Sequence, residues 1–287
     1  MERLKAWYIS LYVLVASLVS LHILLQLSRT WRVEWVGALM ACTALLGFLI
    51  WLFVRRPART TAHLFGVTCF AWLGACLAVF GTLTASDPDW WPVLYALPLG
   101  LGGFLLYLLW YSRLASRGRQ LQLLSKLPDI TLLRLDGTPV TNSDLLGNPV
   151  VWLFFRGNWC PLCVAQIHEI AALYRQLSEQ GITVALVSPQ PAKKTRALAR
   201  RFDVPLLFLQ DKDNAAAETL GIAHFDGVPV GLGLFGYGRH SVMPTVLVTN
   251  GDGEVIFLDQ SDNYRLRPEP QTFLKVIERE RTRRAGL

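Results

Sequence analysis

The fold is decided by the stretch Val-Val-Trp-Leu-Phe-Phe-Arg-Gly-Asn-Trp-Cys-Pro-Leu-Cys, residues 150–163. Val150–Phe155 is an unbroken apolar run, which is typical of a strand buried on both faces of a sheet. A proline suits the first turn of a helix, and an amphipathic helical pattern runs from Pro161 to Gln180. The sequence therefore predicts a buried strand, a short loop, and a helix whose first turn carries Cys160 and Cys163.

The Cys-x-x-Cys spacing predicts a redox pair. At a helix amino terminus the dipole and the free N–H groups favour a thiolate, so we expect a lowered pKa at Cys160. Cys163 lies one turn later, where it can resolve a mixed disulfide formed by Cys160. Half of a zinc site and two buried structural thiols are the alternatives. A zinc site would need further ligands, and this half of the chain offers only scattered histidines at positions 168, 224 and 240.

The elements around this stretch predict an α/β domain from residue 127 to residue 287. Turn residues Asp136-Gly137 and Asn250-Gly251-Asp252-Gly253 predict two hairpins. The other expected elements are strands at 182–187 and 206–209 and helices at 191–202, 215–220 and 269–284. Gly231–Gly236 matches the glycine spacing of a dinucleotide fingerprint but follows no strong strand, so we interpret it as a mobile loop near Pro244.

Several short segments carry a family resemblance. They are Pro128-Asp129-Ile130, Leu135-Asp136-Gly137, Phe155–Cys163, Val187–Gln190, Met243-Pro244-Thr245 and Asn263–Pro268. Residues 127–277 thereby resemble the thioredoxin fold, and more narrowly the peroxiredoxin-like branch of the alkyl hydroperoxide reductase and thiol-specific antioxidant (AhpC/TSA) family. The resemblance implies a mixed sheet flanked by helices, and Trp159 and Pro161 fit its active-site pattern. It also implies a cis-proline at Pro244 facing the cysteines, with the Met243 backbone offered to substrate.

One departure from the family bears on the reaction. Typical peroxiredoxins have Pro-x-x-x-Thr-x-x-Cys, and the corresponding positions here are Leu153 and Gly157. The hydroxyl that would bind a peroxide is absent, which favours disulfide exchange over peroxide reduction. Arg156 is expected either to stabilise the thiolate or to be an exposed, solvated side chain.

The first 113 residues predict an all-α membrane domain. Four apolar blocks, at about 7–27, 35–54, 62–82 and 91–111, each have the length of a transmembrane helix. The first block is too long for a signal peptide and three more follow it. Pro98 should kink the fourth block. Cys42, Cys69 and Cys76 lie inside the blocks; Cys42 and Cys76 could form an intramembrane pair, but small apolar filler is the simpler interpretation.

Charge predicts the orientation. The net charge of +7 resides entirely in residues 1–126, including a basic connector at 114–126, and the rest is neutral. This argues against nucleic-acid binding. Nine Lys and Arg flank the amino terminus, the second loop and the end of the fourth block, against two on the other side. The positive-inside rule then puts both termini and the redox domain in the cytoplasm, at a bacterial inner membrane.

The sequence thus predicts a membrane-anchored, cytoplasm-facing thiol–disulfide oxidoreductase. Its expected partners are a protein disulfide or hydroperoxide, a thiol reductant and the lipid bilayer, with no cofactor beyond the redox-active disulfide and no metal. Three alternatives stay open: a peroxiredoxin-like peroxide reductase, the same chemistry on the outer side as in cytochrome-maturation thioredoxins, and a non-enzymatic redox sensor or membrane-protein assembly partner.

Overall fold

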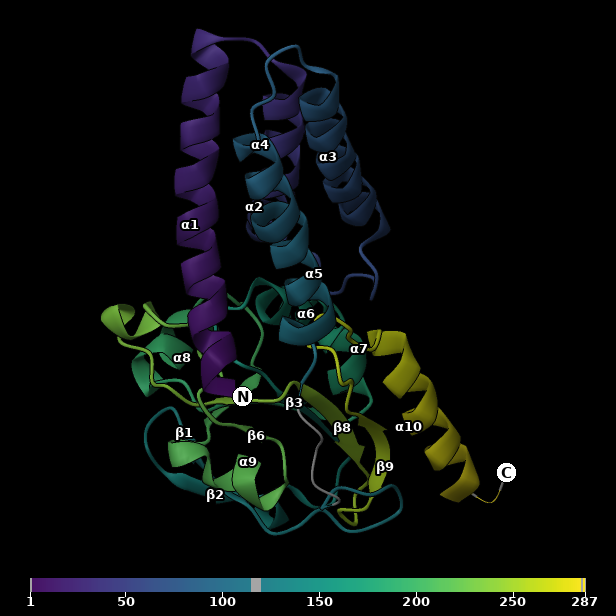
Figure 1. Ribbon diagram of the computed structural model, residues 1–287. Helices are drawn as coiled ribbons and strands as arrows, with labels where there is room; N and C mark the ends of the chain where they lie inside the picture. The colour runs from purple at the N-terminus through teal and green to yellow at the C-terminus, as the bar shows by residue number, and fades with distance from the viewer. Residues whose placement is uncertain (1, 115–119, 285, 287) are drawn as a thin grey trace. The chain divides into compact units, whose positions relative to one another are not determined.

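The computed structural model describes residues 2–114, 120–284 and 286, and it divides into two units (Figure 1). An all-helical unit comprises Leu4–Arg56 and Thr60–Arg113, and an α/β unit is built mainly from Leu114 onward. Residues 115–119 of the predicted basic connector lie outside the described residues. Residues 120–126 form turns and extended chain, not helix.

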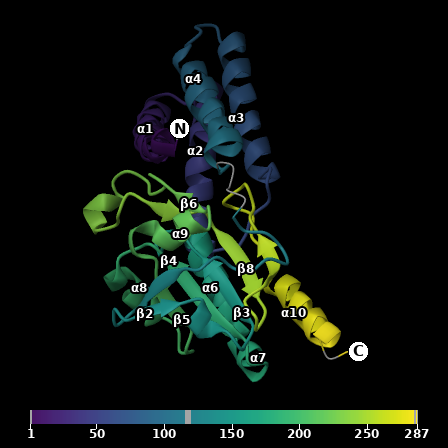
Figure 2. The same ribbon diagram turned by 90° about the horizontal axis from the view of Figure 1, so that it is seen from below.

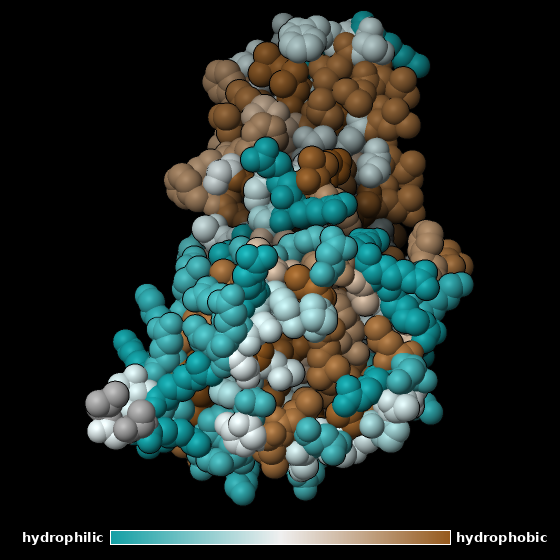
Figure 3. Space-filling model, turned by 180° about the vertical axis from the view of Figure 1, so that it is seen from behind, coloured by the Kyte–Doolittle hydropathy of each residue, from teal (hydrophilic) through white to brown (hydrophobic). Residues whose placement is uncertain are grey.

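The helical unit contains four helices that are long and apolar enough to cross a membrane. They are α1 (Glu2–Arg29), α2 (Val33–Arg55), α3 (Phe65–Thr84) and a fourth composed of α4 (Trp91–Leu94), η1 (Tyr95–Gly102), α5 (Gly103–Leu106) and η2 (Tyr107–Tyr111). These helices coincide with the four predicted blocks. On the face drawn in Figure 3, most of the surface of this unit is hydrophobic.

The fourth helix is wound unusually. Pro98 lies inside η1, which is a π-helix rather than an α-helix. Proline has no N–H and its ring crowds the preceding turn, so an α-helical hydrogen bond is lost at this point. The wider turn of the π-helix accommodates this loss, so the effect of Pro98 seen in the structure is a change of helix type.

Small residues set the packing of α2 against α3. A Cβ atom added to Gly37 would lie 2.3 Å from the backbone nitrogen of Ala78, and one added to Gly74 would lie 2.6 Å from that of Ala41. Such glycines let two helix backbones approach closely. Cys42 is buried where α2 meets the fourth helix, and its Sγ lies 3.3 Å from the Tyr95 carbonyl oxygen, whereas Cys76 is exposed. Cys42 is therefore a small core residue, and it is not paired with Cys76.

The α/β unit is built on a seven-stranded mixed sheet of order β2-β1-β5-β4-β3-β8-β9. Its strands are β1 (Thr131–Arg134), β2 (Pro139–Thr141), β3 (Val150–Phe154), β4 (Thr183–Ser188), β5 (Leu207–Gln210), β8 (Thr245–Thr249) and β9 (Val255–Asp259). Strands β3, β4 and β5 are parallel, and β8 pairs antiparallel with β3. Every residue of β3 is buried, as the apolar run predicted.

Helices flank the sheet, which confirms the predicted architecture. They are α6 (Pro161–Ala172), α7 (Tyr174–Glu179), α8 (Ala192–Ala199), α9 (Ala215–Thr219) and α10 (Pro270–Arg284), with short turns η3 (Ser143–Leu145), η4 (Lys212–Asn214) and η5 (Leu232–Phe235). In Figure 2, α10 lies on the β8–β9 side of the sheet and α8 toward β5. The helix predicted from Pro161 to Gln180 is broken at Leu173. A two-stranded sheet of β6 (Ala223–His224) and β7 (Ser241–Val242) was not predicted.

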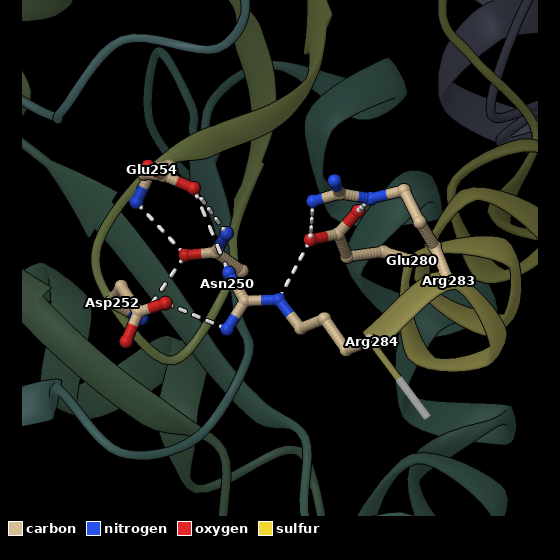
Figure 4. Close-up of polar contacts among 6 residues, drawn as sticks. All are labelled: Asn250, Asp252, Glu254, Glu280, Arg283 and Arg284. Atoms are coloured by element: carbon tan, nitrogen blue, oxygen red, sulfur yellow. Dashed lines mark hydrogen bonds and ion pairs between the residues drawn. The ribbon is translucent and has the colours of Figure 1, made fainter. Parts of the chain in front are cut away.

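An ion-pair network joins the end of α10 to the β8–β9 turn (Figure 4). Arg284 lies 2.6 Å from an oxygen of Asp252, and Glu280 accepts hydrogen bonds from both Arg283 and Arg284. These bonds lower the pKa of Glu280 to about 2. The network is at the surface, where each pair contributes little, so it orders the turn rather than stabilising the unit strongly.

Candidate active site

Cys160 and Cys163 come together at the carboxyl end of β3, as predicted. Pro161 is the first residue of α6, and Cys160 immediately precedes the helix in an extended conformation. The Cys163 N–H donates to the Cys160 carbonyl oxygen, which closes the first turn. The two sulfurs lie 2.9 Å apart, within hydrogen-bond distance. Cys160 is 2% exposed and Cys163 is 0% exposed, so the reduced dithiol is almost sealed from water.

A second arginine, missed by the sequence reasoning, contacts the dithiol. The Nη2 of Arg267 lies 3.6 Å from the Cys163 sulfur. Arg267 follows β9, more than 100 positions along the chain, and is 8% exposed. In the sequence, the only feature that pointed to Arg267 was its position in the Asn263–Pro268 segment, which carries part of the family resemblance. A buried guanidinium at this distance stabilises a thiolate electrostatically.

Of the two thiols, Cys163 has the lower pKa. Burial raises the pKa of the Cys163 thiol, but the hydrogen bond from Cys160 and the positive charge of Arg267, together with Arg156, outweigh burial and lower it to about 6. The hydrogen bond to Cys163 and burial raise the pKa of Cys160. The two sulfurs therefore share one proton. The expected lowered pKa at Cys160 is wrong for this closed dithiol, because Cys163 is the sulfur that faces Arg267.

Arg156 is buried, so its interpretation as a solvated surface side chain is wrong. Its Nη2 donates to the Gly227 carbonyl oxygen at 2.6 Å. Its guanidinium lies 4.8 Å from the ring centroid of Trp159 and 5.2 Å from that of Tyr264. Cation–π contacts of this kind hold the charge in place beside the cysteine loop.

Two further side chains clamp the cysteine loop. Gln190 Oε1 accepts from the Asn158 N–H at 2.9 Å, while its Nε2 donates to Thr195 Oγ1 at 3.2 Å. Tyr237 donates its hydroxyl hydrogen to Asn158 Oδ1 at 2.5 Å. Neither Gln190 nor Tyr237 was predicted as a site residue, because each reaches Asn158 from a distant part of the chain. Together they fix the loop that presents Cys160.

The structure explains why a glycine, and not the threonine typical of the family, stands at position 157. Its φ is +150°, and a Cβ atom at this position would lie 2.5 Å from the Trp159 indole nitrogen. A threonine would therefore have to displace the indole from the place where it contacts Arg156. The absence of a threonine hydroxyl at position 157 and the packing of the Trp159 indole against Arg156 therefore have the same cause, the lack of a Cβ atom at Gly157.

We expect Gly157→Thr to lower the midpoint of thermal unfolding by about 5 °C more than Gly137→Thr does. Gly137 is the matched control because its φ is +92° but nothing lies within 4 Å of an added Cβ. Both substitutions therefore strain the backbone, and only the first creates a clash. Unfolding of the full chain in detergent, followed by tryptophan fluorescence, measures the difference; equal losses would contradict the proposed clash.

The expected role of the Met243–Pro244 segment is wrong in two respects. The Met243–Pro244 peptide bond is trans. The Met243 N–H donates to the Ile222 carbonyl oxygen at 2.7 Å, and its carbonyl oxygen accepts from Thr245 Oγ1 at 3.0 Å. This backbone is used internally, since the segment continues the pairing of β6 with β7. Among the described residues, no group of three or more potential metal ligands comes together.

Residues 124–257 match the model of the AhpC/TSA family. We call this part of the chain the AhpC/TSA domain, after the family that it matches. It is 28% identical over 97 residues to a putative peroxiredoxin bcp of Coxiella burnetii, and 27% identical over 95 residues to the chloroplastic peroxiredoxin Q of Sedum lineare. The two alignments cover 34% and 33% of this chain. The chain spans 64% and 51% of these curated relatives.

The AhpC/TSA domain is also similar to solved structures. The peroxidoxin BcpB of Mycobacterium tuberculosis matches with a TM-score of 0.46 and 22% identity, covering 55% of this chain and 97% of that protein. Reduced Prx3 of Vibrio vulnificus matches with a TM-score of 0.48 and 21% identity, covering 55% and 99%. The family match includes both cysteines and stops short of Arg267, and it does not extend to the four apolar helices.

Proposed function

We propose that the chain is a membrane-anchored peroxide reductase that works through Cys160 and Cys163. The observation that carries the proposal is a buried dithiol in contact with the buried Arg267, in an AhpC/TSA domain that also buries Arg156. The names of the curated relatives, which are peroxiredoxins, support peroxide as the substrate class. The sequence alone favoured disulfide exchange over peroxide reduction, and these observations reverse that preference.

Burial of the pair supports a small oxidant. Cys160 is only 2% exposed, and the loop before it is held by hydrogen bonds to Gln190 and Tyr237. A hydroperoxide needs only a narrow opening to reach the sulfur. A protein disulfide would need Cys160 to protrude, because thiol–disulfide exchange aligns three sulfurs.

The proposed reaction starts with a proton shift. The Cys163 thiolate takes the proton of Cys160 across the 2.9 Å contact, which leaves a thiolate on the more exposed sulfur. That thiolate attacks the terminal oxygen of the hydroperoxide and the O–O bond breaks. Cys160 becomes a sulfenic acid, and the departing alkoxide takes the proton from Cys163 to give the alcohol.

The second step closes the disulfide. The Cys163 thiolate attacks the Cys160 sulfenic acid, the S–S bond forms, and hydroxide leaves and is protonated to water. The peroxide has then gained two electrons and the dithiol has lost two. A thiol reductant restores the pair by exchange. In this sequence Cys160 attacks and Cys163 resolves, the roles predicted from the motif, while Arg267 and Arg156 stabilise the anionic forms.

Disulfide exchange is the second candidate, because Gly157 leaves no hydroxyl to bind a peroxide. Turnover of the full chain with excess dithiol reductant separates the two reactions. We expect hydrogen peroxide or an alkyl hydroperoxide to be consumed at least tenfold faster than a peptide disulfide at equal concentration. The opposite preference would make the protein a disulfide reductase, and a single stoichiometric oxidation without turnover would make it a sensor.

We further propose that the four apolar helices span a membrane and that both termini and the redox domain are cytoplasmic. The support is the excess of Lys and Arg on the side shared by the termini and the second loop. A reporter fused after Leu287 that is active only outside the cytoplasm would reverse this orientation.

A further inference from the structure

A short loop of the AhpC/TSA domain exposes large apolar side chains. Leu234 is 90% exposed and Phe235 is 66% exposed; we call these two residues the apolar tip. They belong to η5, which is flanked by Gly231 at φ +99° and Gly236 at φ +78°. Among the described residues, most of the surface of both side chains is left uncovered. Soluble surfaces rarely expose neighbouring Leu and Phe to this extent unless they contact a partner.

The loop that carries the apolar tip lies beside a basic helix (Figure 1). The Lys194 ammonium is 4.6 Å from the ring centroid of Tyr237, and Asn158 Nδ2 donates to the Lys194 carbonyl oxygen at 3.5 Å. We call α8 and the turn after it the basic helix, for its five cations: Lys193, Lys194, Arg196, Arg200 and Arg201. An exposed apolar pair next to clustered cations is the pattern of segments that bind at a lipid–water interface.

We propose that the apolar tip and the basic helix together form a membrane-binding surface that holds the redox domain against the anionic face of the bilayer. The occupant is the bilayer because the same chain carries four helices fit to span one. The last of these helices ends at Tyr111, and Leu121 is already buried in the core of the α/β unit. Ten residues reach at most about 35 Å, so a bilayer spanned by these helices would be within reach of the domain.

Charge complementarity supports the same occupant. Cations near an anionic surface each add to binding, and apolar side chains that enter the headgroup region add to it further.

The inference rests on the proposed membrane anchoring, and it specifies the substrate class of the proposed reductase. Tyr237, on the same loop as the apolar tip, hydrogen-bonds to Asn158, two residues before Cys160. The surface would therefore bring the dithiol to hydroperoxides of phospholipids.

Contact with lipid can be measured directly. A fluorescent non-natural amino acid at position 234 of the full chain, in nanodiscs of phosphatidylcholine and phosphatidylglycerol, should be quenched by doxyl-labelled lipid. The matched control is position 146, because Leu146 is 50% exposed and precedes β3, at the opposite end of the strand from Cys160. We expect quenching at position 234 to exceed that at 146 several-fold, and to weaken in nanodiscs of phosphatidylcholine alone. Equal quenching at the two positions would overturn the proposal and favour a protein partner for the loop.

Activity supplies the second test. We expect the double substitution Leu234→Asp and Phe235→Asp to slow reduction of phospholipid hydroperoxide in nanodiscs about tenfold while leaving reduction of hydrogen peroxide unchanged. An equal effect on both substrates, or on neither, would contradict a membrane-binding role. If the unsubstituted chain reduces no peroxide, the proposed function fails, and the quenching comparison still decides the membrane-binding surface.

Discussion

Cys160→Ser removes peroxide reduction, with an expected loss of at least about a thousandfold in the second-order rate constant. The reason is that a serine hydroxyl is not ionised near neutral pH and cannot attack the O–O bond. Peroxide consumption by the full chain with excess dithiol reductant gives the rate. Cys163→Ser should behave differently: Cys160 is still oxidised once, and the resulting sulfenic acid persists and reacts with dimedone.

Cys69→Ser is the matched control for both variants. Cys69 is an exposed, free cysteine of α3 and takes no part in the proposed site. It should leave turnover unchanged. Peroxide turnover retained by Cys160→Ser would contradict the assignment of Cys160 as the attacking sulfur. Turnover retained by Cys163→Ser would show that resolution comes from an external thiol.

Arg267→Met is expected to shift the pH dependence of the reaction. In the unsubstituted chain the pKa of Cys163 is lowered to about 6, so reactive anion is present above that pH and is lost as the pH falls through it. Without the Arg267 charge, burial dominates and the pKa rises. A rise of one to two units would reduce the anion at pH 7 by about twofold to tenfold.

The thiolate absorbance near 240 nm and the rate of peroxide consumption should shift together along the pH axis. Arg283→Met is the matched control, since Arg283 is an exposed arginine of α10 that pairs with Glu280. It should leave both curves in place. A variant at position 267 that keeps the original pH profile would show that Arg156 alone sets the charge of the pair.

Local chemistry explains what the sequence could predict. The apolar run of β3, the proline at the start of α6 and the spacing of the two cysteines are all encoded within fourteen residues, 150–163. The Asp136-Gly137 and Asn250–Gly253 turns likewise specify their own hairpins. The prediction of the four apolar helices required only the length and composition of the blocks. Each of these features depends on neighbours in the chain and not on packing.

Long-range packing explains what the sequence could not predict. Arg267 reaches Cys163 only because the chain after β9 passes beside α6, and its positive charge helps to lower the pKa of Cys163. Arg156 is buried because Gly227 and two aromatic rings receive it. The Met243 backbone is used internally because β7 pairs with β6, which carried no strong strand signal. In each case the deciding partner is more than 70 positions away or lies in an irregular segment.

The most direct measurement of the central claim is a single oxidation of the reduced full chain. One equivalent of hydrogen peroxide is added without reductant, and peptides containing residues 160 and 163 are examined by mass spectrometry. We predict complete consumption of the peroxide and a loss of two hydrogens, with both cysteines joined in one disulfide. Unconsumed peroxide together with two free thiols at positions 160 and 163 would contradict it.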